Sequence, residues 1–150
     1  MKIVIQRVSE ASVTIDNAKV AEIKMGLLVL LGIVDDDTQE DINFLVRKTV
    51  NLRIFNDEED KMNLSLADVD GEAIIVSQFT LHASTKKGNR PSYIKAARPE
   101  TAIPLYEAFI KEFEQQLGKK VGSGSFGAMM DVELINDGPV TIGIDSKNRE

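Results

Sequence analysis

The sequence contains no cysteine and a single histidine, His82. The lack of cysteine excludes disulfides, thiolate metal sites and a cysteine nucleophile. One imidazole is too few for a histidine metal cage, and it is the only side chain of its type that acid–base chemistry could use. We therefore expect neither a metal site nor a cofactor.

Long hydrophobic runs are also absent, since no apolar stretch approaches the ~20 residues that a membrane-spanning helix needs. The opening residues, MKIVIQRVSE, reach Gln6 and Arg7 after a short apolar run, which is typical of a strand and not of a secretion signal. With no signal and no membrane span, we expect a cytoplasmic protein.

What is present is an ordinary globular composition: 150 residues, of which 43% are hydrophobic and 28% charged. A chain of this length buries roughly two thirds of its unfolded surface in one domain, so we predict a single domain over residues 1–150. The net charge of −6 argues against a generally basic surface for nucleic acid. Residues 84–98 are an exception, because they contain cationic but no acidic side chains, and they form either a solvated loop or a polyanion-binding surface. These cations are Lys86, Lys87, Arg90, Lys95 and Arg98.

The first 34 residues are rich in Val and Ile, with turn residues at 16–17 and at Gly26, and they predict three strands joined by hairpins. The third strand, residues 27–34, is so apolar that we expect it at the centre of the sheet. Further strands are predicted around residues 72–84, where the far half turns polar, and at 128–135 and 140–144.

Two stretches have the apolar spacing of amphipathic helices. One begins near Glu40, after the capping residues 35–38, and the other lies between Pro99 and Gly118. Together with the strands they predict an α+β fold with mixed, largely antiparallel sheets and two main helices.

Residues 122–127, GSGSFG, match the G-x-G-x-x-G pattern of dinucleotide-binding proteins. That pattern needs a strand before it and a helix after it, so that the pyrophosphate meets a helix N-terminus. Here a helix comes first and a strand follows, so we reject nucleotide binding. The glycines still allow the backbone to approach a ligand or another chain closely.

The stretch 77–81, SQFTL, places two hydroxyls and an amide at the polar end of an apolar strand. Ser77 and Thr80 either satisfy backbone groups where the strand leaves the core, or they line a pocket in which backbone N–H groups stabilise an oxyanion. In a regular strand, Thr80 and His82 would share one face. A lone histidine near a strand end is more typical of a solvent-facing side chain than of a catalytic base, and we expect that here.

Two acidic stretches, residues 35–37 and 57–60, lack the spacing of a calcium loop and are predicted to be turn and capping residues.

A second turn signal, Gly138-Pro139, interrupts the last predicted strands, because Pro has no N–H for a sheet ladder. A hairpin turn is the ordinary explanation of this pair.

Three of these stretches, SQFTL at 77–81, FGAMM at 126–130 and NDGPVT at 136–141, resemble the signature motifs of the D-aminoacyl-tRNA deacylases. The stretches MKIVIQRVSEASV, GLLVLLGI, NLRIF and RPSY resemble the same family, and the resemblance runs in order from Met1 to about Asp145. It implies the family's barrel-like fold and a homodimeric hydrolase. Such an enzyme cleaves the ester between a D-amino acid and the 3′ end of tRNA.

The resemblance also implies roles for individual residues. Gly138 and Pro139 would form a Gly–cis-Pro pair that reaches into the partner subunit's site and receives the α-ammonium of the amino acid on main-chain carbonyls, steadied by Arg7. The Phe79 N–H would be the oxyanion donor, and residues 125–129 would form the wall near the terminal adenosine. The cationic residues of 84–98 would contact the acceptor stem. The expected catalytic residues are Ser77, Gln78, Phe79 and Thr80, and the expected substrate-binding residues are Arg7, Phe126, Gly127, Ala128, Met129, Asn136, Gly138 and Pro139.

Several alternatives stay open at this level. In one mechanism, the 2′-hydroxyl of the substrate activates water. In the second mechanism, Thr80 is the nucleophile. The chain could also be a non-catalytic RNA-binding or interaction module of the same fold, or a hydrolase of small esters or peptides. His82 stands where many relatives have tyrosine, which argues against histidine catalysis, and Ser123 and Ser125 are atypical beside the FGA motif.

Overall fold

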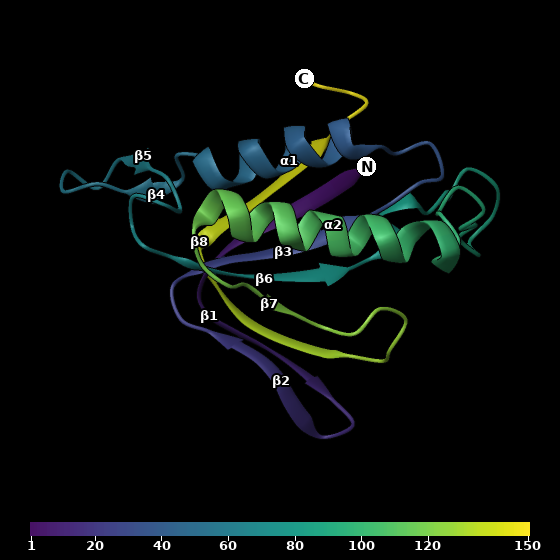
Figure 1. Cartoon of the computed structure of the whole chain (residues 1–150), viewed down its shortest axis with the longest axis horizontal. Helices are drawn as coiled ribbons and strands as arrows, with labels where there is room; N and C mark the ends of the chain where they lie inside the picture. The colour runs from purple at the N-terminus through teal and green to yellow at the C-terminus, as the bar shows by residue number, and fades with distance from the viewer.

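The computed structural model describes all 150 residues, and its main feature is one strongly curved six-stranded sheet (Figure 1). The strand order is β2-β1-β3-β6-β7, with β8 paired to the other side of β1. The β3–β6 and β6–β7 pairs are parallel and the other pairs are antiparallel. The strands are β1 (Lys2–Ile15), β2 (Ala18–Ile23), β3 (Gly26–Gly32), β6 (Glu72–Ser77), β7 (Gly122–Ser123) and β8 (Asp131–Asp145), and β4 (Phe55–Asn56) and β5 (Met62–Leu64) form a separate hairpin.

Two helices, α1 (Gln39–Asn51) and α2 (Pro99–Leu117), lie side by side on one face of the sheet (Figure 1). Helix α1 starts at the predicted cap, where the Thr38 N–H donates to the Asp41 carboxylate at 2.8 Å. Helix α2 starts at Pro99 and ends at Gly118, whose φ of 81° is the left-handed conformation that favours glycine. Both predicted helices are therefore confirmed, close to their predicted ends.

The core lies on both faces of the sheet, because alternate residues of a strand point to opposite sides. Leu27, Val29 and Leu31 of β3 pack under the helices. Leu28 of β3 and Ile74 of β6 instead belong to a second cluster inside the curl formed by β1, β2 and β8. Because β3 carries apolar residues to both faces, it occupies the central place that its sequence predicts.

The last strand differs from the prediction. Residues 128–135 and 140–144 do not form two strands of a hairpin; residues 131–145 form one strand, β8, that follows β1 from end to end. Val8 pairs with Asn136 and Gln6 pairs with Thr141, so the single residue Arg7 faces the four residues 137–140. The Gly-Pro pair is thus part of a large bulge, and bulges are among the few places where a sheet tolerates proline.

The bulge changes the face to which β8 points. Before it, Val132 and Leu134 pack inside the curl. After it, Val140 and Ile142 pack on the helix side, although all four positions have even numbers. A regular strand would keep them on one face. The three additional residues of the bulge, an odd number, produce the switch.

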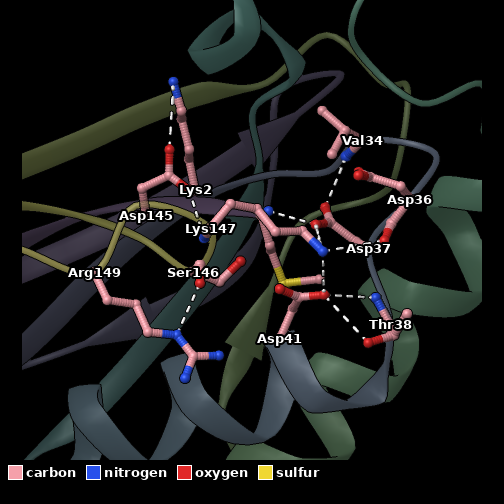
Figure 2. Close-up of polar contacts among 11 residues, drawn as sticks. Lys2, Val34, Asp36, Asp37, Thr38, Asp41, Asp145, Ser146, Lys147 and Arg149 are labelled. Carbon is pink, nitrogen blue, oxygen red and sulfur yellow. Dashed lines mark hydrogen bonds and ion pairs between the residues drawn. The ribbon is translucent and has the colours of Figure 1, made fainter.

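The chain ends are held together by an ionic cluster at one edge of α1 (Figure 2). Asp37 accepts from the Val34 N–H and pairs with the ammonium of Met1, and Lys147 Nζ lies 3.0 Å from Asp41. Burial disfavours the charged form of Asp41. Three neighbouring groups outweigh that effect and lower the pKa of Asp41 to about 2. They are the Ser146 hydroxyl, which lies outside hydrogen-bond geometry, the Thr38 N–H and Lys147.

The predicted fold class is confirmed: a mixed, barrel-like sheet with two main helices. Both acidic stretches act in turns and caps as predicted. Asp37 accepts the N–H group of Val34, and Asp57 accepts the N–H groups of Glu59 and Lys61. No helix of the chain combines the length and hydropathy that crossing a membrane requires.

Candidate active site

The polar end of β6 is the first part of the candidate site. The strand stops at Ser77, and the chain turns at Gln78 into a short 3-10 helix, η1 (Phe79–His82). The Gln78 N–H donates to Leu31 at 2.7 Å, and the Leu81 N–H donates back to Gln78 at 3.2 Å. Phe79 and Thr80 open the helix, so their N–H groups have no acceptor within it. Two adjacent backbone donors are therefore free to bind an oxyanion at this point.

The Thr80 hydroxyl is held by an amide rather than by a base. Gln78 Nε2 donates to Thr80 Oγ1 at 2.5 Å, and no other side-chain hydrogen bond to this hydroxyl is present. An activated nucleophile needs a general base within hydrogen-bond reach. The arrangement suits Thr80 to a structural or positioning role better than to nucleophilic attack.

Two expectations for His82 are wrong, that it shares a strand face with Thr80 and that it faces solvent. The strand ends before Thr80, so Thr80 and His82 are not neighbours on a strand face. His82 is also buried, with 9% of its surface exposed, and its Nε2 atom has no hydrogen-bond partner. The cause is the helical turn, which folds His82 back against Gly32, where an added Cβ would lie 3.0 Å from the imidazole.

A pocket of about 310 Å³ opens beside these donors. Its lining is mainly apolar and comes from the ends of β3 and β6, from Ala102 of α2 and from residues 126–130. Phe126 is held from behind by the ring of Tyr106, with a centroid separation of 6.0 Å. Burial raises the pKa of Tyr106 to about 12, so its hydroxyl stays neutral and donates to the Ile75 carbonyl at 2.8 Å. The fold thus brings together two of the three motifs, 77–81 and 126–130.

The segment 122–130 has the context that argued against a dinucleotide site. It follows a helix, contains the short strand β7 and continues into β8, with no helix after the glycines. Gly127 has a φ of 79° in a turn closed by the Ala128 N–H and the Ser125 carbonyl, at 3.1 Å. The turn projects Met129, which is 90% exposed.

The third motif is held in place by Arg7. The Arg7 side chain is buried, and its Nε atom donates to the Asp137 carbonyl at 2.8 Å. Its Nη1 atom donates to the Ile54 carbonyl at 2.6 Å and to Asn56 at 3.2 Å. One guanidinium therefore ties the start of the bulge to the β4–β5 hairpin.

Asn136 closes the bulge across its base. Its amide accepts from the Val140 N–H at 2.8 Å and donates to the Thr141 hydroxyl at 2.9 Å. Within the bulge, Gly138 has a φ of 141°, the peptide bond before Pro139 is cis, and both residues are exposed. A rigid, solvent-facing turn of main chain results.

The bulge and the pocket of one chain lie far apart. Arg7, opposite the bulge, is level with Leu27 and Ala73, whereas Ser77 lies four residues farther along β6. That is about 13 Å along the strands, and the three strand spacings from β8 to β6 add about 14 Å across them, or roughly 19 Å in all. No residue of the bulge lines the pocket. Figure 1 shows the same separation, with the bend of β8 at the opposite end of the sheet from the tip of β6.

The basic loop, residues 84–98, leaves the sheet directly after η1. Ser84 and Ser92 exchange backbone hydrogen bonds at 2.8 and 2.9 Å, and the Ala97 N–H donates to Ile33 at 2.9 Å. All the predicted tRNA-contacting cations of the loop are exposed, and none forms an ion pair: Lys86, Lys87, Arg90, Lys95 and Arg98. The loop is therefore an ordered cationic surface beside the pocket.

Sequence reasoning missed some residues that support the site. Tyr106 gave no more signal than any other apolar position of its helix, and the Arg7 acceptors Ile54 and Asn56 gave none. For Asn136, which was expected to bind substrate, the structure shows in addition that its amide closes the bulge. Tyr93 contacts Phe79, and its signal was an aromatic ring inside a basic loop.

Comparisons with known proteins agree on one family. The family model described as D-Tyr-tRNA(Tyr) deacylase matches residues 4–145. The chain is 65% identical to a D-aminoacyl-tRNA deacylase of Flavobacterium johnsoniae and 60% identical to one of Bacteroides thetaiotaomicron, each over the full length of both chains.

Two solved structures are also similar. One, titled c-Myc DNA Unwinding Element Binding Protein, is 41% identical, with a TM-score of 0.92 over 97% of this chain and 98% of its own. The other, a probable eukaryotic D-amino acid tRNA deacylase, is 18% identical, with a TM-score of 0.83 over 95% of this chain and 97% of its own, and supports the fold alone.

Proposed function

The chain belongs to the D-Tyr-tRNA(Tyr) deacylase family and is a D-aminoacyl-tRNA deacylase, an ester hydrolase, and from this premise we propose how it holds and selects its substrate. The aminoacyl end of the tRNA enters the pocket between the tip of β6 and residues 126–130. The observation that carries the proposal is an apolar pocket wall beside two free N–H groups, that of Phe79, which lines the pocket, and that of Thr80, the next residue in the chain. The activity takes place in the cytoplasm, where aminoacyl-tRNA is made.

Hydrolysis then needs positioning more than a strong nucleophile, because an aminoacyl ester is already activated. The 2′-hydroxyl of the terminal adenosine accepts a proton from water as the water adds to the ester carbonyl. The N–H groups of Phe79 and Thr80 stabilise the oxyanion. As the ester C–O bond breaks, the 2′-hydroxyl passes its extra proton to the departing 3′-oxygen, which releases the 3′-hydroxyl and the free amino acid. Loss of one such donor typically costs ~10²–10³ in rate, so backbone donors can supply much of the catalysis.

Gly138 and Pro139 are the proposed selector of the D-configuration. Their main-chain carbonyls would accept hydrogen bonds from the α-ammonium, which fixes the ammonium and the ester together. An L-amino acid would then have to direct its side chain into the wall, whereas many D side chains would fit. Glycine, which has no side chain to clash, is a further proposed substrate.

The selector would come from a second subunit. In an amino acid the ammonium and the ester carbonyl are separated by a single carbon atom, whereas the bulge and the pocket of one chain are roughly 19 Å apart. A homodimer in which each bulge enters the partner's pocket would satisfy both contacts. Arg7 and Asn136 would act as positioning residues that hold the bulge from behind.

The basic loop, residues 84–98, would hold the acceptor stem of the tRNA. Its cations have no acidic partners within the chain, so they are available to phosphates. Binding through phosphates releases counterions and weakens as salt rises. We expect the KM for D-aminoacyl-tRNA to rise between roughly 50 and 200 mM salt. It should rise less in the double variant Lys86→Ala/Lys87→Ala, which has lost two phosphate contacts. A KM that is flat with salt would contradict this assignment.

The experiment that tests the whole proposal measures hydrolysis of the same tRNA charged with D- and with L-tyrosine, while chain mass is measured in solution. We expect cleavage of the D-ester only, by a dimer. Equal cleavage of both would contradict the selector, and a monomer with full activity and full selectivity would contradict the shared site.

A second function has one observation in its favour. The solved structure with 41% identity is titled as a DNA unwinding element binding protein, so DNA binding is a second candidate role beside hydrolysis. It predicts that the chain binds DNA, which carries no aminoacyl ester. Cleavage of small esters that carry no RNA would favour a general esterase instead.

A further inference from the structure

Two aromatic rings form an exposed step at the mouth of the pocket. Phe79 and Tyr93 meet edge to face, with ring centroids 5.0 Å apart and planes at 76°. Phe79 is 53% exposed and Tyr93 39% exposed, although rings of this size are ordinarily buried. Phe79 also lines the pocket, so the step begins where the pocket ends.

The step is held firmly from the loop side. Tyr93 directly follows Ser92, which pairs with Ser84, and its carbonyl accepts from the Ala96 N–H at 3.0 Å. Along the chain, Tyr93 lies between Arg90 and Lys95, both exposed and without ion pairs. An exposed aromatic ring between free cations is the combination that binds unpaired nucleic acid, because bases stack on the ring while cations follow the phosphates.

We propose that the Phe79–Tyr93 step stacks the unpaired nucleotides on the 5′ side of the terminal adenosine of the tRNA. This inference rests on the proposed function, and it adds a binding surface outside the pocket for the RNA itself. Stacking on an aromatic face tolerates every base and needs no base-specific hydrogen bonds. That suits an enzyme that must hold the unpaired end of many different tRNAs.

The proposal also explains why Tyr93 is exposed at this position. The pocket takes the amino acid and the terminal adenosine, so the preceding nucleotide leaves the pocket at Phe79. The step lies there, and the basic loop continues outward from it toward the duplex. Tyr93 would therefore be a positioning residue for the RNA and would have no part in the chemical step.

The test compares two substrates that carry the same D-amino acid ester: D-tyrosyl-tRNA and D-tyrosyl-adenosine, which lacks all preceding nucleotides. Stacking of one base is worth roughly 5- to 150-fold in affinity. We expect Tyr93→Leu to raise the KM for D-tyrosyl-tRNA within that range, with kcat unchanged, and to leave hydrolysis of D-tyrosyl-adenosine as in wild type. Tyr93→Phe, which keeps the ring, should behave as wild type on both.

Ile94→Ala is the matched control, because Ile94 is a neighbouring exposed apolar residue, 89% exposed, outside the aromatic pair. It should leave the KM unchanged. Tyr93→Leu with a wild-type KM on tRNA would overturn the inference, and so would an equal loss on both substrates, which would make Tyr93 a support of the pocket. In either case the proposed function stands if wild type cleaves D-tyrosyl-tRNA. A wild-type protein inactive on D-tyrosyl-tRNA would overturn both.

Discussion

Replacing Arg7 with methionine is the sharpest test of how the bulge of β8 is held. Methionine is of similar length and can fill the buried site, but it donates no hydrogen bond. The change removes the donors to the Asp137 carbonyl, at 2.8 Å, and to the Ile54 carbonyl, at 2.6 Å. The bulge then loses its tie to the β4–β5 hairpin, while the rest of β1 keeps its ladder.

The magnitude follows from which groups stay buried. Ile54 is 6% exposed, so its carbonyl would be left unsatisfied at a cost of about 1–3 kcal/mol. Asp137 is half-exposed and can turn to water, so its lost bond and its ion pair with Arg7, at 3.5 Å, add little. Removing a buried cation also relieves its desolvation cost. We therefore expect the free energy of unfolding to fall by about 2 kcal/mol.

The assay combines urea unfolding with hydrolysis of D- and L-tyrosyl-tRNA. We expect Arg7→Met to unfold at lower urea and to lose at least about tenfold in kcat/KM on the D-ester, since a misplacement of 1 Å can cost ~10². Arg7→Lys should recover only part of either, because lysine lacks the planar fork that reaches two acceptors at once.

The control is Arg47→Met, at an exposed arginine of α1 whose side chain makes no hydrogen bond or ion pair, and it should match wild type in both assays. The reasoning is refuted if Arg7→Met unfolds at the wild-type urea concentration. If Arg7→Met loses stability as expected but keeps wild-type activity, only the positioning role is refuted.

Three further predictions concern other parts of the chain. Gly138→Ala should abolish most activity on D-aminoacyl-tRNA, because a Cβ there would meet Val140 at 2.8 Å and Arg7 at 3.0 Å, and the φ of 141° is strained for alanine; wild-type kcat/KM would contradict this. Thr80→Ala should keep turnover within about tenfold of wild type, since a positioning role costs far less than loss of a nucleophile, and a fall beyond about 10³ would restore the nucleophile mechanism. Asp41→Asn should lower the free energy of unfolding at pH 7 by about 2 kcal/mol. Because the pKa of Asp41 is lowered to about 2, its carboxylate stabilises the fold above the unfolded value of 3.8, and this stabilisation is lost as pH falls from there toward 2. The difference in urea midpoint between variant and wild type should therefore close over that pH range. A difference independent of pH would contradict the prediction.

Much of the fold could be predicted because its signals are local. The caps at Thr38 and Gly118, the apolar spacing of both helices and the uniformly apolar β3 each report on residues near them in the sequence. They are satisfied by the same short-range physics in the structure.

The parts that escaped prediction depend on partners far along the chain. A Gly-Pro pair between two apolar runs has the same local signature in a hairpin turn and in a bulge, and only the pairing of both halves of β8 with β1 separates them. Likewise, the buried state of His82 depends on where β6 ends and on Gly32 of another strand. Arg7 was singled out by resemblance, but its acceptor at Ile54 lies 47 residues away and has no marker in the sequence.

The face switch of β8 sets a rule for insertions and deletions in this chain. Because residues 137–140 replace one residue of a regular ladder, their number decides by parity which side of the sheet receives Val140 and Ile142. Removing or adding one residue anywhere in the bulge would turn that half of the strand inside out, whereas a change of two residues would keep its orientation. The length of the bulge can therefore drift only in steps of two.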